Sequence, residues 1–256
     1  MLLAVASLPL QRAPTSALQM TLARTLASDV ISGTLSVALS APLVCTMDRA
    51  MTLNAAGRQS LPAACREDLS NIARRPIAFV RSTPFLWIWF AYGITYIVAN
   101  VLSTVAVPVA MQLLVTTGVN TAVCIAKDAK FTVLYGKNED DDQRPLPPSS
   151  FGCFLARDIA TMGFVFTLPS LIIRAAPRLP ELTCRFATPL LCQYITTPLY
   201  LLGLAFYNLP GSPLREKIAT VRRDYLPTVT TRQIRAIAQY SLTSVANSRL
   251  RVVLAG

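Results

Sequence analysis

The chain alternates long uncharged, apolar stretches with short polar segments rich in turn-forming residues. The stretches without Lys, Arg, Asp or Glu cover 30–47, 82–126, 159–173, 186–214 and 236–248. A bilayer core of about 30 Å takes roughly 20 apolar helical residues. The stretch 82–126 is too long for one span and is expected to hold two, with Pro108 as the break between them.

This pattern predicts an all-α integral membrane protein with about six transmembrane helices. The expected spans are roughly 25–47, 83–107, 109–135, 150–174, 183–207 and 228–253. Residues 1–24 would form a targeting-like or flexible segment, and 25–256 the membrane domain. Several spans carry charges at membrane depth, which are costly against lipid and should face a bundle interior or a water-filled cavity.

The segments between the spans are polar. Gly57–Arg75 has an amphipathic pattern and is expected to form a short surface helix, and Pro213 could begin a second one. Gly136–Ser150 contains four of the thirteen acidic residues and is expected to be a solvated loop.

Composition supports the membrane assignment. Of 256 residues, 53% are hydrophobic and 14% are charged, against about 25% charged in ordinary soluble domains. This excludes a disordered chain and argues against one soluble globule. The net charge of +11 fits membrane lipid as a partner, anionic lipid such as cardiolipin included. Because the basic residues flank spans, no nucleic-acid partner is expected.

The chain has no histidine, so a histidine base or metal ligand is excluded. It has no C-x-x-C pair and no glycine-rich phosphate loop. We therefore expect no enzyme activity, no catalytic residue, no metal site and no cofactor. The six cysteines lie mostly in apolar stretches, where a free thiol acts as a small hydrophobe; a disulfide or redox role is the alternative.

The N-terminal segment is basic and lacks acids: Arg12 and Arg24 precede the first acidic residue, Asp29. This favours a mitochondrial presequence, and hence the mitochondrial inner membrane, over a secretory signal. The segment could also remain attached as part of the first helix.

Three similar strings repeat along the chain, at 39–43, 115–119 and 195–199. Each places small or hydroxyl residues before a helix breaker, and the breakers are Pro42, Gly118 and Pro198. Two are followed by charges, which are Asp48 and Arg49 after the first and Lys127 and Asp128 after the second. Kinks followed by charges could form a gate on one side of the membrane. The repeats would cover roughly 25–107, 108–174 and 183–254; chance similarity is the alternative.

Six spans, three repeats and breakers in the odd helices resemble the mitochondrial carrier family. That family has Pro-x-acid-x-x-base at the end of each odd helix, and this chain departs from it at all three places. The strings at 127–136, 154–172 and 196–211 are similar to a fungal group of carrier-like mitochondrial membrane proteins. The resemblance implies a bundle of six helices in three two-helix repeats around a central site.

Polar residues at membrane depth are the candidate substrate-binding residues. They are Asn100, Arg157, Asp158, Arg235 and Gln239. As neighbours on a helix, Arg157 and Asp158 should point about 100° apart and each need another partner. Interhelical hydrogen bonds, ion pairs or lipid head groups are alternative roles for these side chains.

An excess of arginine favours an anionic solute, because guanidinium groups bind carboxylates and phosphates bidentately. The leading hypothesis is a mitochondrial inner-membrane carrier that moves a small anionic metabolite by alternating access. The alternative is a degenerate, non-transporting scaffold or adaptor with unidentified protein partners. The absence of gate charges after Pro198 favours the scaffold, and the arginines at membrane depth favour transport.

Overall fold

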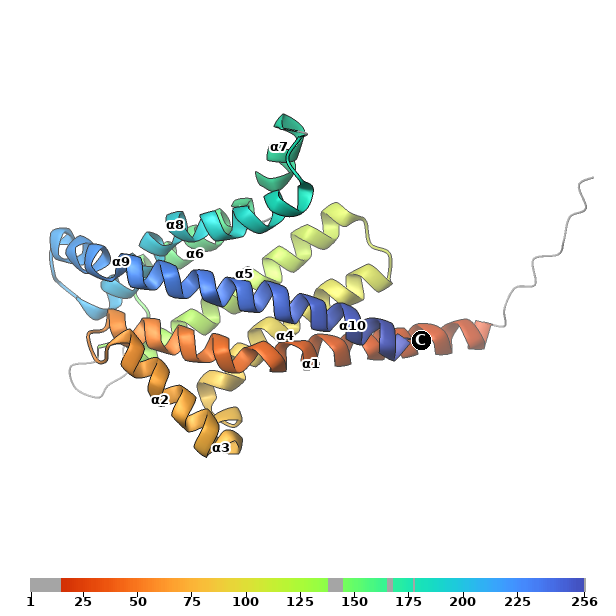
Figure 1. Cartoon of the computed structure of the whole chain (residues 1–256), viewed down its shortest axis with the longest axis horizontal. Coiled ribbons are helices and arrows are strands. Elements are labelled where there is room, and N and C mark those ends of the chain that lie inside the picture. Colours follow the sequence, from red (N-terminus) through yellow and green to blue (C-terminus); the bar gives the residue numbers. More distant parts are fainter. Residues whose placement is uncertain (1–14, 138–144, 165–167, 177, 256) are drawn as a thin grey trace, which may run out of the picture.

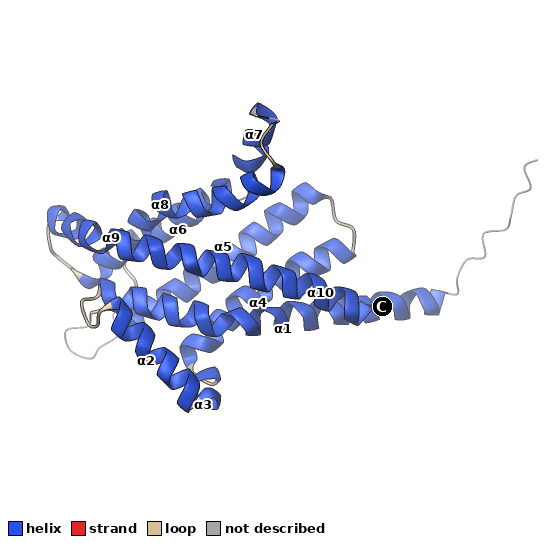
Figure 2. Cartoon of the chain, viewed as in Figure 1, coloured by secondary structure: helices blue, strands red, loops and turns tan. Residues whose placement is uncertain are grey.

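The computed structural model describes residues 15–137, 145–164, 168–176 and 178–255, and the secondary structure of these residues is helical without strands (Figure 2). The expectation of an all-α protein is therefore confirmed. The elements are α1 (Thr15–Ala55), α2 (Leu61–Arg74), α3 (Pro76–Val80), α4 (Thr83–Thr104), α5 (Val109–Tyr135), α6 (Pro148–Met162), α7 (Leu168–Ala175), α8 (Glu181–Asn208), α9 (Leu214–Ile237), the π-helical segment η2 (Ala238–Thr243) and α10 (Ser244–Ala255).

Helix α1 is the longest of the described helices. Its 41 residues extend about 60 Å at 1.5 Å per residue. Figure 1 shows α1 along the long axis of the molecule, with α10 beside it, and α1 packs on both α4 and α10. The helix begins at Thr15, so residues 15–24 of the predicted targeting segment are helical. It continues through Pro42.

Small residues let α1 approach α4 closely. A stripe of buried serines repeats every four residues on α1, at Ser28, Ser32, Ser36 and Ser40. At Gly33, an added Cβ would lie 2.9 Å from Cγ1 of Ile97 and 3.0 Å from its backbone nitrogen. Such stripes are typical of helix contacts inside membranes, where close packing replaces the hydrophobic effect as the driving force.

Helices α8 and α10 pack on different neighbours. Helix α8 packs on α6 and α9, whereas α10 packs on α1. The segment η2 joins α9 to α10 without a break in the helical run. A π-helical turn inside a longer helix is often found at functional sites.

In the described part of the chain, four helices are long and apolar enough to cross a membrane: Met20–Ala55, Thr83–Thr104, Val109–Tyr135 and Ala187–Asn208. The protein is thus a multi-pass helical membrane protein by length and composition. The six-span carrier bundle is not confirmed. The expected fourth span is covered by α6 and α7, of 15 and 8 residues, and the expected sixth is part of the arginine-bearing run from α9 to α10.

The short polar connections follow the prediction in part. Helix α2 lies in the segment expected to hold a surface helix, although its buried residues are Ala64 and Asp68 while Leu69 is exposed. The second expected surface helix is not separate, because α9 begins at Leu214 and continues to Ile237. Of the expected loop Gly136–Ser150, residues 138–144 lie outside the described part, and Ser150 already belongs to α6.

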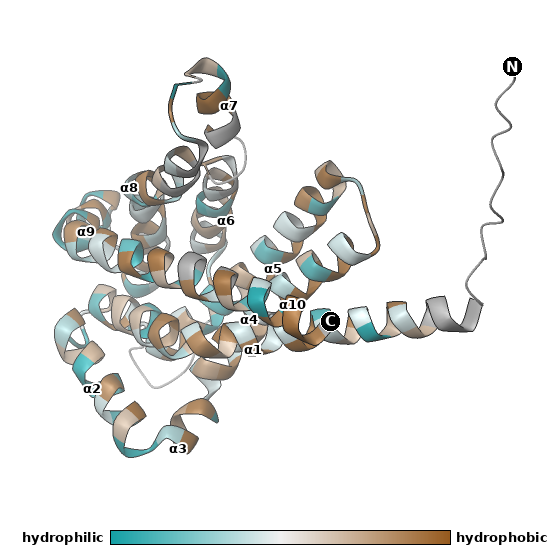
Figure 3. Cartoon of the chain, turned by 45° about the vertical axis from the view of Figure 1, so that its right-hand side comes forward, coloured by the Kyte–Doolittle hydropathy of each residue, from teal (hydrophilic) through white to brown (hydrophobic). Residues whose placement is uncertain are grey.

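The outside of the bundle is largely apolar and its interior is unusually polar. Figure 3 shows apolar segments along α1, α4 and α5. Large apolar side chains such as Leu39, Phe90, Leu114 and Leu191 are exposed, while many serines, threonines and charged residues are buried. Exposed apolar faces of this kind fit a lipid environment. The buried polar and charged residues give the bundle a polar interior.

Candidate functional site

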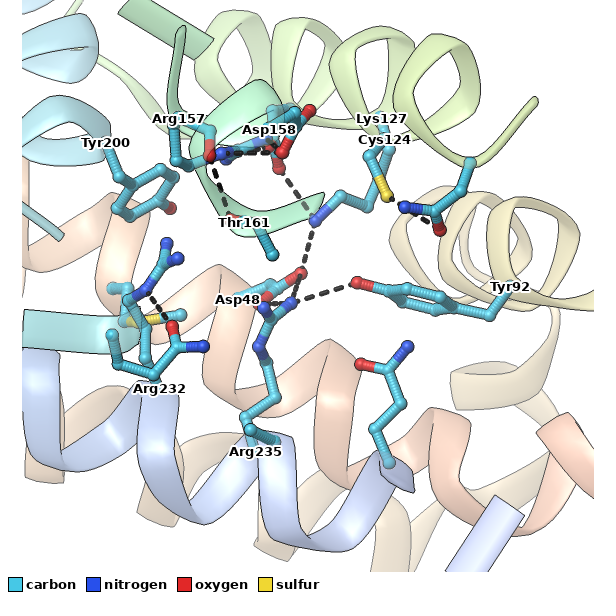
Figure 4. Close-up of a pocket in the computed structure, with 16 residues that line it drawn as sticks. Asp48, Tyr92, Cys124, Lys127, Arg157, Asp158, Thr161, Tyr200, Arg232 and Arg235 are labelled. Atoms are coloured by element: carbon cyan, nitrogen blue, oxygen red, sulfur yellow. Dashed lines mark hydrogen bonds and ion pairs between the residues drawn. The ribbon is translucent and has the colours of Figure 1, made fainter. Parts of the chain in front are cut away.

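A polar pocket lies where six helices and η2 meet, with a cavity volume of about 70 Å³. Its lining combines charged, amide, hydroxyl, thiol and aromatic side chains (Figure 4). The lining residues are Asp48, Met51, Tyr92, Asn120, Cys124, Lys127, Asp128, Arg157, Asp158, Thr161, Gln193, Tyr200, Arg232, Arg235, Ala236 and Gln239. The cavity has room for several water molecules.

An ion-pair network crosses the pocket. Lys127 Nζ on α5 lies 2.5 Å from Asp48 Oδ2 on α1 and 2.7 Å from Asp128 Oδ1. Asp128 Oδ2 accepts a hydrogen bond from Arg157 on α6. Arg235 on α9 donates to both oxygens of Asp48 and, at 2.9 Å, to the hydroxyl of Tyr92 on α4. The network therefore joins α1, α4, α5, α6 and α9.

The neighbours Arg157 and Asp158 do pair with each other, contrary to the expectation that they point apart. Arg157 donates through Nε at 2.9 Å and Nη2 at 2.7 Å to the same oxygen, Asp158 Oδ1. The 100° separation of their Cα–Cβ bonds is bridged because the arginine side chain is long enough to turn back. Asp158 Oδ2 is buried and has no hydrogen-bond partner among the described residues.

Arg232 is the cation of the pocket that lacks a carboxylate partner within the described part of the chain. It is 4% exposed. Its Nε donates to Gln193 Oε1 at 2.9 Å, its Nη2 donates to Thr196 at 3.3 Å, and its guanidinium carbon lies 5.1 Å from the centroid of the Tyr200 ring. A buried guanidinium held only by neutral groups is costly, so it is a strong attractor for an anionic group.

The lining charges do not cancel. Four cations, on Lys127, Arg157, Arg232 and Arg235, meet three carboxylates, on Asp48, Asp128 and Asp158. Neutral amides complete the lining. Gln239 makes no side-chain hydrogen bond with a described residue, and Asn120 uses its carbonyl oxygen for Thr95 and Cys124. The pocket thus offers an uncompensated positive charge together with uncharged amide groups.

An apolar layer separates the pocket from the end of the bundle where α1, α5 and α8 finish. Its buried members are Met51, Ala55, Ile125, Phe154, Tyr200, Leu201 and Leu204. At the same end, the backbone nitrogen of Lys137 donates to Asn208 Oδ1 at 2.9 Å, and Ser150 donates to the carbonyl of Gly203 at 2.7 Å. These contacts hold the segment after α5 and the start of α6 against α8 at this end.

Four of the five candidate substrate-binding residues line the pocket, namely Arg157, Asp158, Arg235 and Gln239. Asn100 does not. It forms a reciprocal amide pair with Asn247 on α10, with both hydrogen bonds at 2.9 Å, and also donates to the carbonyl of Asp29 and to Ser32. Tyr92 and Asn100, eight residues apart on α4, therefore lie in different places, with Tyr92 at the pocket and Asn100 two turns away.

The gate candidates divide in the same way. Asp48, Lys127 and Asp128 line the pocket, whereas Pro42, Gly118 and Pro198 are not among its lining residues and lie within continuous helices. Arg49 faces α2, where it pairs with Glu67 at 3.0 Å and with Asp68 at 2.7 Å. Burial raises the pKa of Asp68 to about 6, against the lowering effect of the Arg49 charge.

Sequence reasoning missed Arg232 and Gln193 as site residues. Arg232 lies one helical turn before Arg235 on the same face, and this spacing was a usable signal. Gln193 is an amide near the start of the uncharged stretch 186–214, which was a second signal. Within the described residues, no group of three potential metal-ligating side chains comes together, and the six cysteines are free.

A family model described as "Probable citrulline exporter" matches residues 32–255. No curated protein matches the chain, and no solved structure does. The resemblance to the mitochondrial carrier family and its fungal carrier-like group is therefore wrong, because the match identifies a different transporter family. Its basis was weak in physical terms, since small and hydroxyl residues before a helix breaker are common in membrane helices.

Proposed function

The chain belongs to the probable citrulline exporter family, and we propose from this premise that its polar pocket binds an amino-acid solute, such as citrulline, for export across a membrane. A membrane transporter of an amino-acid-like solute fits both the family and the apolar spanning helices. The pocket supplies what such a solute needs, because its carboxylate requires a cation and its polar side chain requires hydrogen-bonding groups.

One observation carries the proposal: Arg232 is buried in the pocket without a carboxylate partner among the described residues. A protein that keeps an uncompensated guanidinium in an apolar bundle sacrifices stability, and the arrangement is understandable if a ligand supplies the missing carboxylate. Unlike Lys127, Arg157 and Arg235, which are bound to aspartates, Arg232 is available without breaking an ion pair.

Transport would proceed by alternating access, with the apolar layer opening when the other side closes. The position of η2 supports this, because it lies between α9, which packs mainly on α8, and α10, which packs mainly on α1. A π-helical turn has weaker helical hydrogen bonding and is a suitable place for the two parts to move. The basic, acid-poor N-terminal sequence supports placing the exporter in the mitochondrial inner membrane.

The experiment is counterflow with purified full-length protein in liposomes preloaded with unlabelled citrulline, followed with labelled citrulline outside. Saturable accumulation that disappears without internal citrulline supports the exporter. Folded protein that gives no counterflow of citrulline or any other amino acid would refute it. That result would favour the non-transporting scaffold.

A further inference from the structure

The aspartates of the pocket are used unequally. Both oxygens of Asp48 and both oxygens of Asp128 are bound to cations. Asp158 uses only Oδ1, which takes both hydrogen bonds from Arg157. Asp158 Oδ2 is the buried carboxylate oxygen of the described lining that lacks a hydrogen-bond partner.

A second Arg–Asp pair of neighbours shows what a satisfied aspartate looks like in the same local geometry. On α9, Arg223 donates to Asp224 through Nε at 2.9 Å to Oδ1 and through its Nη2 at 2.7 Å to Oδ2. Both oxygens of Asp224 are used there, and Asp224 does not line the pocket. At Asp158 the second oxygen, Oδ2, accepts no hydrogen bond from a described residue. A buried carboxylate oxygen without a donor lowers the stability of the protein, and a ligand that donates to it removes this cost.

The Arg157–Asp158 pair and Arg232 meet the pocket beside the same aromatic ring, that of Tyr200. The guanidinium carbons of Arg157 and Arg232 lie 5.7 Å and 5.1 Å from the centroid of the Tyr200 ring. Figure 4 shows Tyr200 with the Arg157–Asp158 pair on one side and Arg232 on the other. Asp158 and Arg232 are each more than nine-tenths buried, so a ligand that reaches them is shielded from water.

We propose that the pocket recognises the zwitterionic head of an α-amino acid, with the carboxylate bound by Arg232 and the ammonium group donating to Asp158 Oδ2. This rests on the proposed function and adds to it the contact that recognises the α-ammonium group, Asp158 Oδ2. A simple carboxylate would pair with Arg232 and leave Asp158 Oδ2 unsatisfied. A simple amine would add a cation to a lining that already holds four cations and three carboxylates. An α-amino acid matches the uncompensated charge of Arg232 and the unpaired oxygen of Asp158 at once.

The test compares three solutes on the wild-type exporter in liposomes: citrulline, its analogue lacking the α-amino group, and its analogue lacking the α-carboxylate. The expected half-saturating concentration rises at least about tenfold for either analogue, as for loss of one charge-assisted hydrogen bond. Equal transport of citrulline and the deaminated analogue would overturn the proposal while leaving the exporter function in place. Transport of none of the three by folded protein would overturn both.

Asp158→Asn assigns the recognition to one side chain. We expect this variant to lose the preference for citrulline over the deaminated analogue, so that the half-saturating concentrations of the two solutes differ by less than about twofold. Asp224→Asn is the matched control and should keep the wild-type preference. An Asp158→Asn variant that transports and still prefers citrulline at least tenfold would overturn the assignment. If that variant does not fold, the wild-type comparison of the three solutes decides the matter alone.

Discussion

Arg235 on α9 donates to Asp48 on α1, with Nη1 at 3.1 Å from Oδ1 and 3.3 Å from Oδ2, although 187 residues separate the two in sequence. Asp48 also binds Lys127 on α5 at 2.5 Å. One buried carboxylate therefore holds three helices together at the level of the pocket. Such a group is more important for keeping its cations neutralised than for adding net stability.

Asp48→Asn is expected to destabilise the protein strongly, because it leaves Lys127 and Arg235 without this shared carboxylate. Breaking a buried ion pair from one side typically costs about 3–5 kcal/mol. Chemical unfolding in detergent should show this loss. The double variant Asp48→Asn, Arg235→Met should lose less than Asp48→Asn alone, because it removes the cation whose carboxylate partner is Asp48, whereas Lys127 still pairs with Asp128. A double variant less stable than the single one would contradict this account of the network.

The amide pair of Asn100 and Asn247 is predicted to be structural. Asn100→Ala should lower the free energy of unfolding by about 1–3 kcal/mol, since it leaves a buried amide unsatisfied. The half-saturating citrulline concentration should stay within about twofold of wild type. A double-mutant cycle with Asn247→Ala should give a coupling energy of at least about 0.5 kcal/mol. Additive effects of the two substitutions would show that the pair does not form.

Two glycines are expected to respond differently to alanine. At Gly33, an added Cβ meets the backbone and side chain of Ile97 at 2.9–3.3 Å, so α1 and α4 must separate and the variant should lose about 1–3 kcal/mol. At Gly118, an added Cβ meets nothing within 4 Å, and alanine should be neutral or stabilise α5 by up to about 1 kcal/mol. Thermal unfolding of both variants checks this. Equal loss at the two sites would contradict the close α1–α4 contact.

Asp68 should make stability depend on pH. Because burial raises its pKa to about 6, the folded protein binds a proton more readily than the unfolded chain, so stability falls as pH rises from about 4 through 6. Its neighbours Glu67 and Arg49 face the same contact. A Gln59 hydrogen bond lowers the pKa of Glu67, which acts in the opposite direction at more acidic pH.

The measurement is the difference in Tm between wild type and Asp68→Asn at pH 4.5, 5.5, 6.5 and 7.5. Wild type should gain relative to the variant as the pH is lowered through this range. A constant difference would show that Asp68 is not protonated within it.

The sequence allowed the membrane class and the helical fold to be predicted, because uncharged stretches of sufficient length appear directly in the chain. It did not allow the span count, since α6 and α7 are short and the run from α9 to α10 carries arginines at regular intervals. Charge at membrane depth indicated Arg157 and Arg235, and both line the pocket; their binding of a substrate stays a prediction. The family could not be identified from three short repeats.

What the sequence could not provide is which polar side chains meet. Asn100 and Tyr92 share a face of α4, yet Asn100 pairs with Asn247 and Tyr92 lies beside Arg235. Likewise, Arg232 and Arg235 are one turn apart, but Arg235 binds an aspartate and Arg232 does not. These outcomes depend on tertiary neighbours from α1, α8 and α10, and helical periodicity carries no information about them.

The most direct test of the central claim is citrulline counterflow by Arg232→Gln, with unfolding of the same preparation measured in parallel. We predict that counterflow at a fixed, subsaturating concentration falls at least about tenfold, as expected for loss of a charge-assisted contact. Stability should be unchanged or higher, because an unpaired buried charge has been removed. Arg223→Gln, at an arginine with a 61% exposed side chain, should transport like wild type. Wild-type counterflow by Arg232→Gln would contradict the account.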